Sequence, residues 1–181
     1  QQRPQGELPR TVQGCLEEAL ARIIGEHRRI QGAGRTDAGV HALGQVAHVD
    51  IPGDKSHISF QAALNHHLPG DVAVVRVEPV HADFHARYDA LDKTYVYSLW
   101  LERSYVLPQR SHYVWPTGPL NLEAMQEALQ LLVGEHDFAS FQNTGSEVKT
   151  TVRTMLKASL HRGEHLPEAG QPGLQVLHDL L

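Results

Sequence analysis

The chain has 181 residues, of which 41% are hydrophobic and 20% charged, a composition that excludes disorder throughout and allows one large domain or two small ones. Its apolar runs, such as Val72–Val75, are too short to cross a bilayer, so we expect no membrane association. The single cysteine, Cys15, rules out an internal disulfide and indicates a reducing compartment, so we expect a cytoplasmic protein. A net charge of −5 argues mildly against a nucleic-acid partner, although a cationic cleft can coexist with an acidic exterior.

The first half of the chain alternates between helical and extended patterns. Apolar residues at helical spacing predict a helix from Thr11, as its N-cap, to about Glu26. A second helix is predicted at Ile58–Leu68, where it is closed by a Pro-Gly turn. We expect strands at His27–Gly32, Gln45–Ile51 and Val72–Val77, the second of them half-buried because apolar and polar residues alternate along it.

The second half begins with a predicted strand at Ala90–Leu101. Three prolines between 108 and 119 mark a linker or a domain boundary. An amphipathic helix is expected from Leu122 to a stop at Gly134, then a strand at Val152–Leu160 and a loop over 163–173. Helices interspersed with strands that can pair antiparallel predict an α+β fold with a mainly antiparallel sheet and helices on one face.

One short loop has the composition of a reactive site. Asp37 stands between Gly34 and Gly39, and Arg35 lies two residues before it. Glycines allow a ligand to approach the main chain closely, and a neighbouring guanidinium favours the ionised carboxylate. The alternative from spacing alone is a plain Asx-turn, in which the Asp37 side chain caps its own backbone.

Two further groups of residues have competing interpretations. Tyr95 and Tyr97 share one face of a predicted strand, where they are either core residues or a surface on which an unpaired base stacks. Histidines and an aspartate can supply ligands for a first-row metal and would then indicate a metal-dependent hydrolase; these residues are His66, His67, His81, Asp83 and His85.

Five blocks in order resemble the A-type tRNA pseudouridine synthase family (tRNA pseudouridine-38/40 synthase). They read GAGRTDAGVHALGQVAHVD, ALNHHLPGDVAVVRV, DFHARYDALDKTYVY, LLVGEHDFASF and TVRT. The resemblance implies an isomerase that converts uridine to pseudouridine in the anticodon stem-loop of tRNA, at positions 38–40, without a metal or another cofactor. It also implies a homodimer with tRNA as its partner.

The resemblance assigns roles to three residues. The aspartate of GRTDAGVH, here Asp37, is the family's catalytic nucleophile. Arg35 is associated with gripping the RNA and extruding the target nucleotide. The first tyrosine of the YxY strand, here Tyr95, contacts the flipped uracil.

The resemblance also implies two ferredoxin-like (RNP-like) lobes. We expect an N-terminal lobe over 1–107, a linker over 108–119 and a partial C-terminal lobe over 120–181. The family's YDGxxxxGWQ-like and HxxVR-like segments are missing, so both ends look trimmed and the strand Val152–Leu160 is expected to lack a later partner. A non-catalytic tRNA-binding remnant of the family therefore remains an alternative to an active enzyme.

Overall fold

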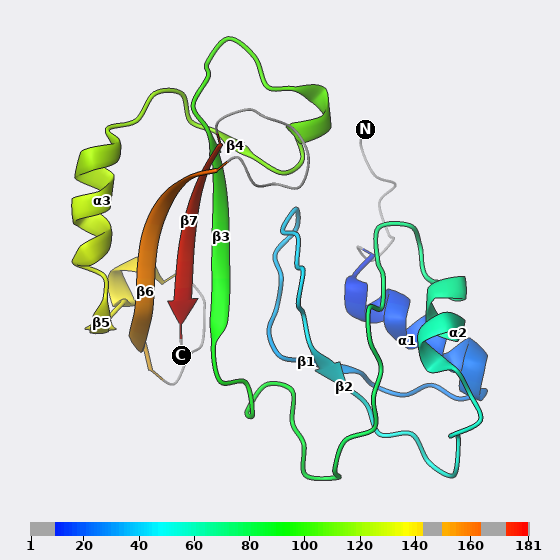
Figure 1. Ribbon diagram of the computed structural model, residues 1–181. Coiled ribbons are helices and arrows are strands. Elements are labelled where there is room, and N and C mark those ends of the chain that lie inside the picture. Colours follow the sequence, from blue (N-terminus) through cyan, green and yellow to red (C-terminus); the bar gives the residue numbers. More distant parts are fainter. Residues whose placement is uncertain (1–9, 143–149, 164–172, 181) are drawn as a thin grey trace. The chain divides into compact units, whose positions relative to one another are not determined.

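The computed structural model describes residues 10–142, 150–163 and 173–180. The chain divides into two compact units, residues 1–90 and 91–181. Figure 1 shows two helices and a short two-stranded sheet in the first unit, and a larger sheet with one flanking helix in the second. Mixed helices and mainly antiparallel strands agree with the predicted α+β class.

The first unit contains α1 (Val12–Ile24), β1 (Gln31–Gly32), β2 (Ala47–His48) and α2 (Phe60–His67). The predicted start of α1 is confirmed, because the Thr11 hydroxyl accepts a hydrogen bond from the Gly14 N–H at 3.0 Å. The helix ends at Gly25, whose φ of 79° is the left-handed conformation that glycine adopts readily, and whose N–H donates to the Ala21 carbonyl.

The core of this unit lies between the two helices and the strands. Its buried members are Ala19 and Leu20 of α1, Ile30 just before β1, and Leu64 of α2. Val49 and Ile51 pack against this cluster, but Ala47 is exposed and only Ala47–His48 of the predicted strand Gln45–Ile51 form a strand. The paired strands themselves are only two residues long.

The strand predicted at Val72–Val77 is wrong, since these residues pair with no strand in the described part of the chain. Side chains of α2 satisfy their backbone instead. Asn65 accepts from the Val74 N–H at 2.7 Å and donates to the Val74 carbonyl at 2.8 Å, and Gln61 donates to the Val75 carbonyl. Hydrogen bonds from a helix therefore take the place of strand pairing in this apolar segment.

The second unit contains a five-stranded sheet in the order β4-β3-β7-β6-β5. Its strands are β3 (Lys93–Trp100), β4 (Trp115–Pro116), β5 (Gly134–Asp137), β6 (Val152–Gly163) and β7 (Gly173–Leu180). β4 runs parallel to β3, and the other pairs are antiparallel. Short 3-10 helices lie at Pro108–Arg110 and Ala139–Phe141.

Helix α3 (Leu122–Gln130) lies beside β6 (Figure 1). The Asn121 side chain caps it by accepting from the Ala124 N–H at 3.0 Å. The helix ends before the predicted stop at Gly134, which instead opens β5 with a φ of 106°. The core between helix and sheet consists of Leu99, Leu129, Met155 and Ala158.

The prediction that Val152–Leu160 lacks a later partner is wrong. β7 lies between β3 and β6 and pairs with both, for instance through Val96↔Leu177 and Leu160↔Val176. The sequence of residues 174–180 does not alternate regularly between apolar and polar, so periodicity gave no strand signal there.

Two other sequence predictions touch this unit. Residues 108–119, predicted as a linker, contain β4, which pairs with β3; the division into lobes at these residues stays a prediction. Most of the predicted loop 163–173 lies outside the described residues. Throughout the described ranges, every helix is too short or too polar to cross a membrane.

Replacing Asn65 with Ala tests whether α2 holds the extended segment. Two hydrogen bonds to Val74 are lost, so we expect the free energy of unfolding to fall by about 1–2 kcal/mol in urea titrations. His66→Ala is the matched control, because both substitutions place Ala in the same helix and gain similar helix propensity. Equal stabilities for the two variants would show that the Asn65 contacts contribute nothing.

Candidate functional site

The Asp37 loop is the segment 34–45, and a short hairpin carries it. β1 and β2 pair antiparallel through Gln31↔His48 and Gly32↔Ala47. The Ala33 N–H extends the pairing by donating to the Val46 carbonyl at 2.8 Å. Beyond it, the Gln45 side-chain amide donates to the Gly34 carbonyl at 3.1 Å. Hydrogen bonds between the two sides of the hairpin therefore close the loop at both of its ends.

Within the loop, Asp37 opens a tight turn with its backbone. The Val40 N–H donates to the Asp37 carbonyl at 3.1 Å, and Gly39 has a φ of 87°. A positive φ at the third residue is what a type II turn requires, so glycine is needed at this position. The turn uses the main chain of Asp37 and leaves its carboxylate outside the hydrogen bonding.

The Asp37 carboxylate is exposed and makes no hydrogen bond or ion pair with any described residue. The Asx-turn interpretation requires such a hydrogen bond and is not supported. Two acceptor oxygens on an exposed loop are available to a reacting group.

Arg35 is also exposed, and it forms no ion pair with Asp37 or with another described residue. Other arginines of the same unit do have carboxylate partners: Arg10 pairs with Asp71, and Arg28 pairs with Glu26. A guanidinium without a carboxylate partner is available to bind an anion such as a phosphate.

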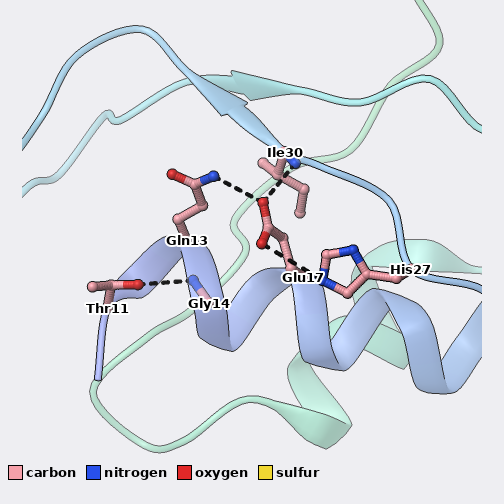
Figure 2. Close-up of polar contacts among 6 residues, drawn as sticks. All are labelled: Thr11, Gln13, Gly14, Glu17, His27 and Ile30. Atoms are coloured by element: carbon pink, nitrogen blue, oxygen red, sulfur yellow. Dashed lines mark hydrogen bonds and ion pairs between the residues drawn. The ribbon is translucent and has the colours of Figure 1, made fainter. Parts of the chain in front are cut away.

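Glu17 connects α1 to the hairpin that carries this loop (Figure 2). Its Oε1 accepts from the Ile30 N–H at 3.0 Å and from the Gln13 side-chain amide at 2.8 Å, and its Oε2 lies 3.8 Å from His27 Nε2. The Glu17 side chain is 14% exposed. Ile30 directly precedes β1, so these contacts fix the strand against the helix.

Burial acts to raise the pKa of the Glu17 carboxyl, but the opposing effects prevail and the pKa is lowered. These are the hydrogen bonds from Gln13 and Ile30, followed by electrostatic interactions with His27 and Arg29. Glu17 is therefore ionised at neutral pH, and both of its hydrogen bonds are charge-assisted.

The other strand of the hairpin is held by the DFHARYDA block. His48 Nδ1 accepts from the buried Ala86 N–H at 3.1 Å, and the His48 and His85 ring centroids lie 4.6 Å apart. The Tyr88 ring follows at 4.2 Å from His85. Each strand of the hairpin is thus fixed to a neighbouring segment by a named side chain.

Tyr95 lies on β3, in the second unit, whereas Arg35 and Asp37 share one loop of the first. Tyr95 is 45% exposed and Tyr97 is 50% exposed, whereas Leu99 further along the same face is buried. In this structure the two tyrosines are therefore surface residues, and an exposed aromatic on a sheet is available for stacking.

The histidines do not assemble into a metal site. In the ranges that the structure describes, no group of three or more His, Cys, Asp or Glu side chains is placed to hold a metal ion. The His85 Nδ1 instead accepts the Arg87 N–H at 3.2 Å, and the His66 and His67 rings contact each other. The metal-dependent hydrolase alternative thus gains no support.

Sequence reasoning missed Glu17 and His48 as residues that hold the hairpin. A signal for Glu17 existed, because it follows Leu16 and precedes Leu20 by three positions, on the side of α1 that faces the core. A carboxylate on an apolar helix face requires hydrogen-bond donors from a neighbouring segment. His48 gave no comparable signal, since its partner is the backbone N–H of Ala86.

Comparison with known proteins defines the class. A family model described as tRNA pseudouridine synthase matches residues 1–89 and 128–169. The chain therefore belongs to the tRNA pseudouridine synthase family, which confirms the resemblance carried by its sequence blocks.

Curated relatives named tRNA pseudouridine synthase A agree with this assignment. The protein from Maridesulfovibrio salexigens is 52% identical over 155 residues, covering 86% of this chain and 57% of its own length. One from Nitratidesulfovibrio vulgaris is 50% identical over 176 residues, or 97% of this chain and 62% of its own. The chain thus spans about three fifths of the length of these relatives.

Replacing Gly39 with Ala tests the turn that presents Asp37. The added Cβ meets no atom within 4 Å, so the cost arises from the positive φ alone, and we expect about 1–2 kcal/mol of destabilisation in urea titrations. Gly44→Ala in the same loop also has open space but no positive φ, and it controls for the lost freedom of the unfolded chain. The turn geometry is refuted if both variants unfold alike.

Proposed function

We propose that the complete protein converts uridine to pseudouridine in tRNA, with Asp37 as its catalytic residue. The observation that carries the proposal is an exposed Asp37 carboxylate that bonds to no described residue. It stands in the GRTDAGVH block of a chain that belongs to the tRNA pseudouridine synthase family. The relatives' printed name supports tRNA as the substrate.

The reaction is an isomerisation, so its atoms balance without a co-substrate. The N1–C1′ bond of uridine breaks, the uracil rotates, and a C5–C1′ bond forms; the proton at C5 is lost to solvent and N1 gains one. A single carboxylate can serve by adding to the nucleotide as a nucleophile or by removing a proton at C2′. Both routes use Asp37 and require no metal ion or organic cofactor.

Arg35 and Tyr95 have substrate-binding roles in this proposal. The target base must leave the helical stack, which costs a few kcal/mol. Arg35, which lacks a carboxylate partner among the described residues, binds a phosphate near the extruded nucleotide. Tyr95 offers an exposed ring to the uracil. Together they offset the energy of extrusion.

The wider setting is proposed on the family resemblance. The target uridines lie at positions 38–40 of the anticodon stem-loop, and the enzyme acts in the cytoplasm. Two ferredoxin-like lobes, divided at residues 108–119, form each subunit. A homodimer with tRNA bound across both subunits is proposed on the same resemblance.

Substitution of Asp37 by Asn tests the catalytic role. We expect pseudouridine formation in the complete protein to be abolished, whereas tRNA affinity stays within a few-fold because binding rests on phosphate contacts. Pseudouridine is measured as tritium release from tRNA labelled at C5 of uridine. Asp50→Asn, an exposed carboxylate close to the same hairpin, is the matched control and should keep full turnover.

Retained turnover in Asp37→Asn would remove Asp37 from the mechanism. A wild-type protein that binds tRNA but releases no tritium would favour the alternative, a tRNA-binding remnant of the family.

Substitution of Tyr95 tests base stacking. Tyr95→Phe keeps the ring and should retain most activity, whereas Tyr95→Leu should lose about 1–3 kcal/mol of transition-state stabilisation, measured as kcat/KM. Val96→Ala is the control, since Val96 is similarly exposed on the opposite face of β3. Wild-type kcat/KM in Tyr95→Leu would exclude a stacking role.

A further inference from the structure

The hairpin below the Asp37 loop is too short to fix its own position. Only two residues of β1 pair with β2, and the burial of both strands is slight. Register is weakly specified where few side chains distinguish one face of a strand from the other. Some contact outside the hairpin must therefore set where β1 begins relative to α1.

Glu17 provides such a contact. Its Oε1 accepts the N–H of Ile30, the buried residue that directly precedes β1, at 3.0 Å (Figure 2). The same oxygen accepts the Gln13 side-chain amide at 2.8 Å, and Gln13 lies one helical turn before Glu17 on α1. The carboxylate is therefore held in one orientation by its own helix while it binds the strand.

We propose that Glu17 is a positioning residue for Asp37, an inference that rests on the proposed function. Its carboxylate fixes Ile30, and the chain from Ile30 passes through β1 and the Ala33–Val46 hydrogen bond into the Asp37 loop. A displacement of about 1 Å in a catalytic group can cost about a hundredfold in rate. The position of β1 along α1 therefore affects turnover more than it affects tRNA binding.

The ionised form of Glu17 suits this role. A carboxylate only accepts hydrogen bonds, so both donors, the Ile30 N–H and the Gln13 amide, can share one oxygen without a competing N–H. A glutamine at the same place has one acceptor oxygen and one donor group, and it can still accept from Ile30 in one of its two amide orientations. Glu17→Gln should thus weaken the contact, whereas Glu17→Ala removes it.

The fold itself does not depend on this contact alone. Leu20, Ile30 and Leu64 bury their side chains together and hold the unit by apolar packing. Apolar packing is not directional, whereas the hydrogen bond to Glu17 is. Loss of Glu17 should therefore shift the hairpin in a unit that stays folded.

The experiment uses the complete protein with Glu17→Ala, Glu17→Gln and the matched control Glu18→Ala, an exposed carboxylate at the next position of α1. Single-turnover rate, KM for tRNA and hydrogen exchange at the Ala33 amide are measured. We expect Glu17→Ala to lose about tenfold or more in rate with KM within about twofold, because binding is carried elsewhere. Glu17→Gln should be intermediate, Glu18→Ala unchanged, and Ala33 should exchange faster only in the Glu17 variants.

The proposal would be overturned if the Glu17→Ala variant were folded and matched the Glu18→Ala variant in both single-turnover rate and hydrogen exchange at the Ala33 amide. A rate loss that only follows the fraction of unfolded protein would also overturn it, because that is the effect of a merely structural residue. Failure of the proposed function is recognised separately: if Asp37→Asn keeps its turnover, Asp37 is not catalytic, and Ala33 exchange still decides whether Glu17 sets the hairpin.

Discussion

The hydrogen bond from the Ile30 N–H to the Glu17 carboxylate is the contact on which the geometry of the site depends. It joins a directional, charge-assisted acceptor on a well-capped helix to the residue that leads into the hairpin. The apolar cluster around Leu20 supplies cohesion, but it does not by itself determine where a two-residue strand begins. Helix α1 is thus joined through Ile30 and β1 to the Asp37 loop.

The paired strands β1 and β2 form the fixed base of the hairpin, and the Asp37 loop forms its open tip. At the base, Glu17 holds the approach to β1 and the Ala86 N–H holds His48 of β2. At the tip, the side chains of Arg35 and Asp37 bond to no described residue. Such a division suits a site whose ligand is large and charged, since pre-organisation lowers the entropy lost on binding while the reactive groups stay uncommitted.

The structural features that local chemistry determines could be predicted from the sequence. The Thr11 cap and the helix that follows it were predicted correctly, because each is set by periodicity or by a capping side chain. The strand at Val72–Val77 was wrongly predicted because an apolar run does not reveal that Asn65, and not a neighbouring strand, binds its backbone. β7 was not predicted because residues 174–180 show no regular alternation of apolar and polar side chains. Asp37 and Arg35 were found from the composition of their loop and from the motif resemblance, whereas the partner of Glu17, the Ile30 N–H, is identified only by the structure.

Hydrogen exchange of the complete protein with and without tRNA tests most directly whether the fixed hairpin presents its loop to RNA. Without tRNA, the amides of Ile30 and Ala33, both hydrogen-bonded, should exchange slowly, and those of the exposed loop at Arg35 and Asp37 fast. On addition of tRNA the loop amides should slow, whereas Ile30 and Ala33 stay as they were. The account would be contradicted if tRNA protected only other segments, or if the amides of Ile30 and Ala33 exchanged as fast as those of Arg35 and Asp37.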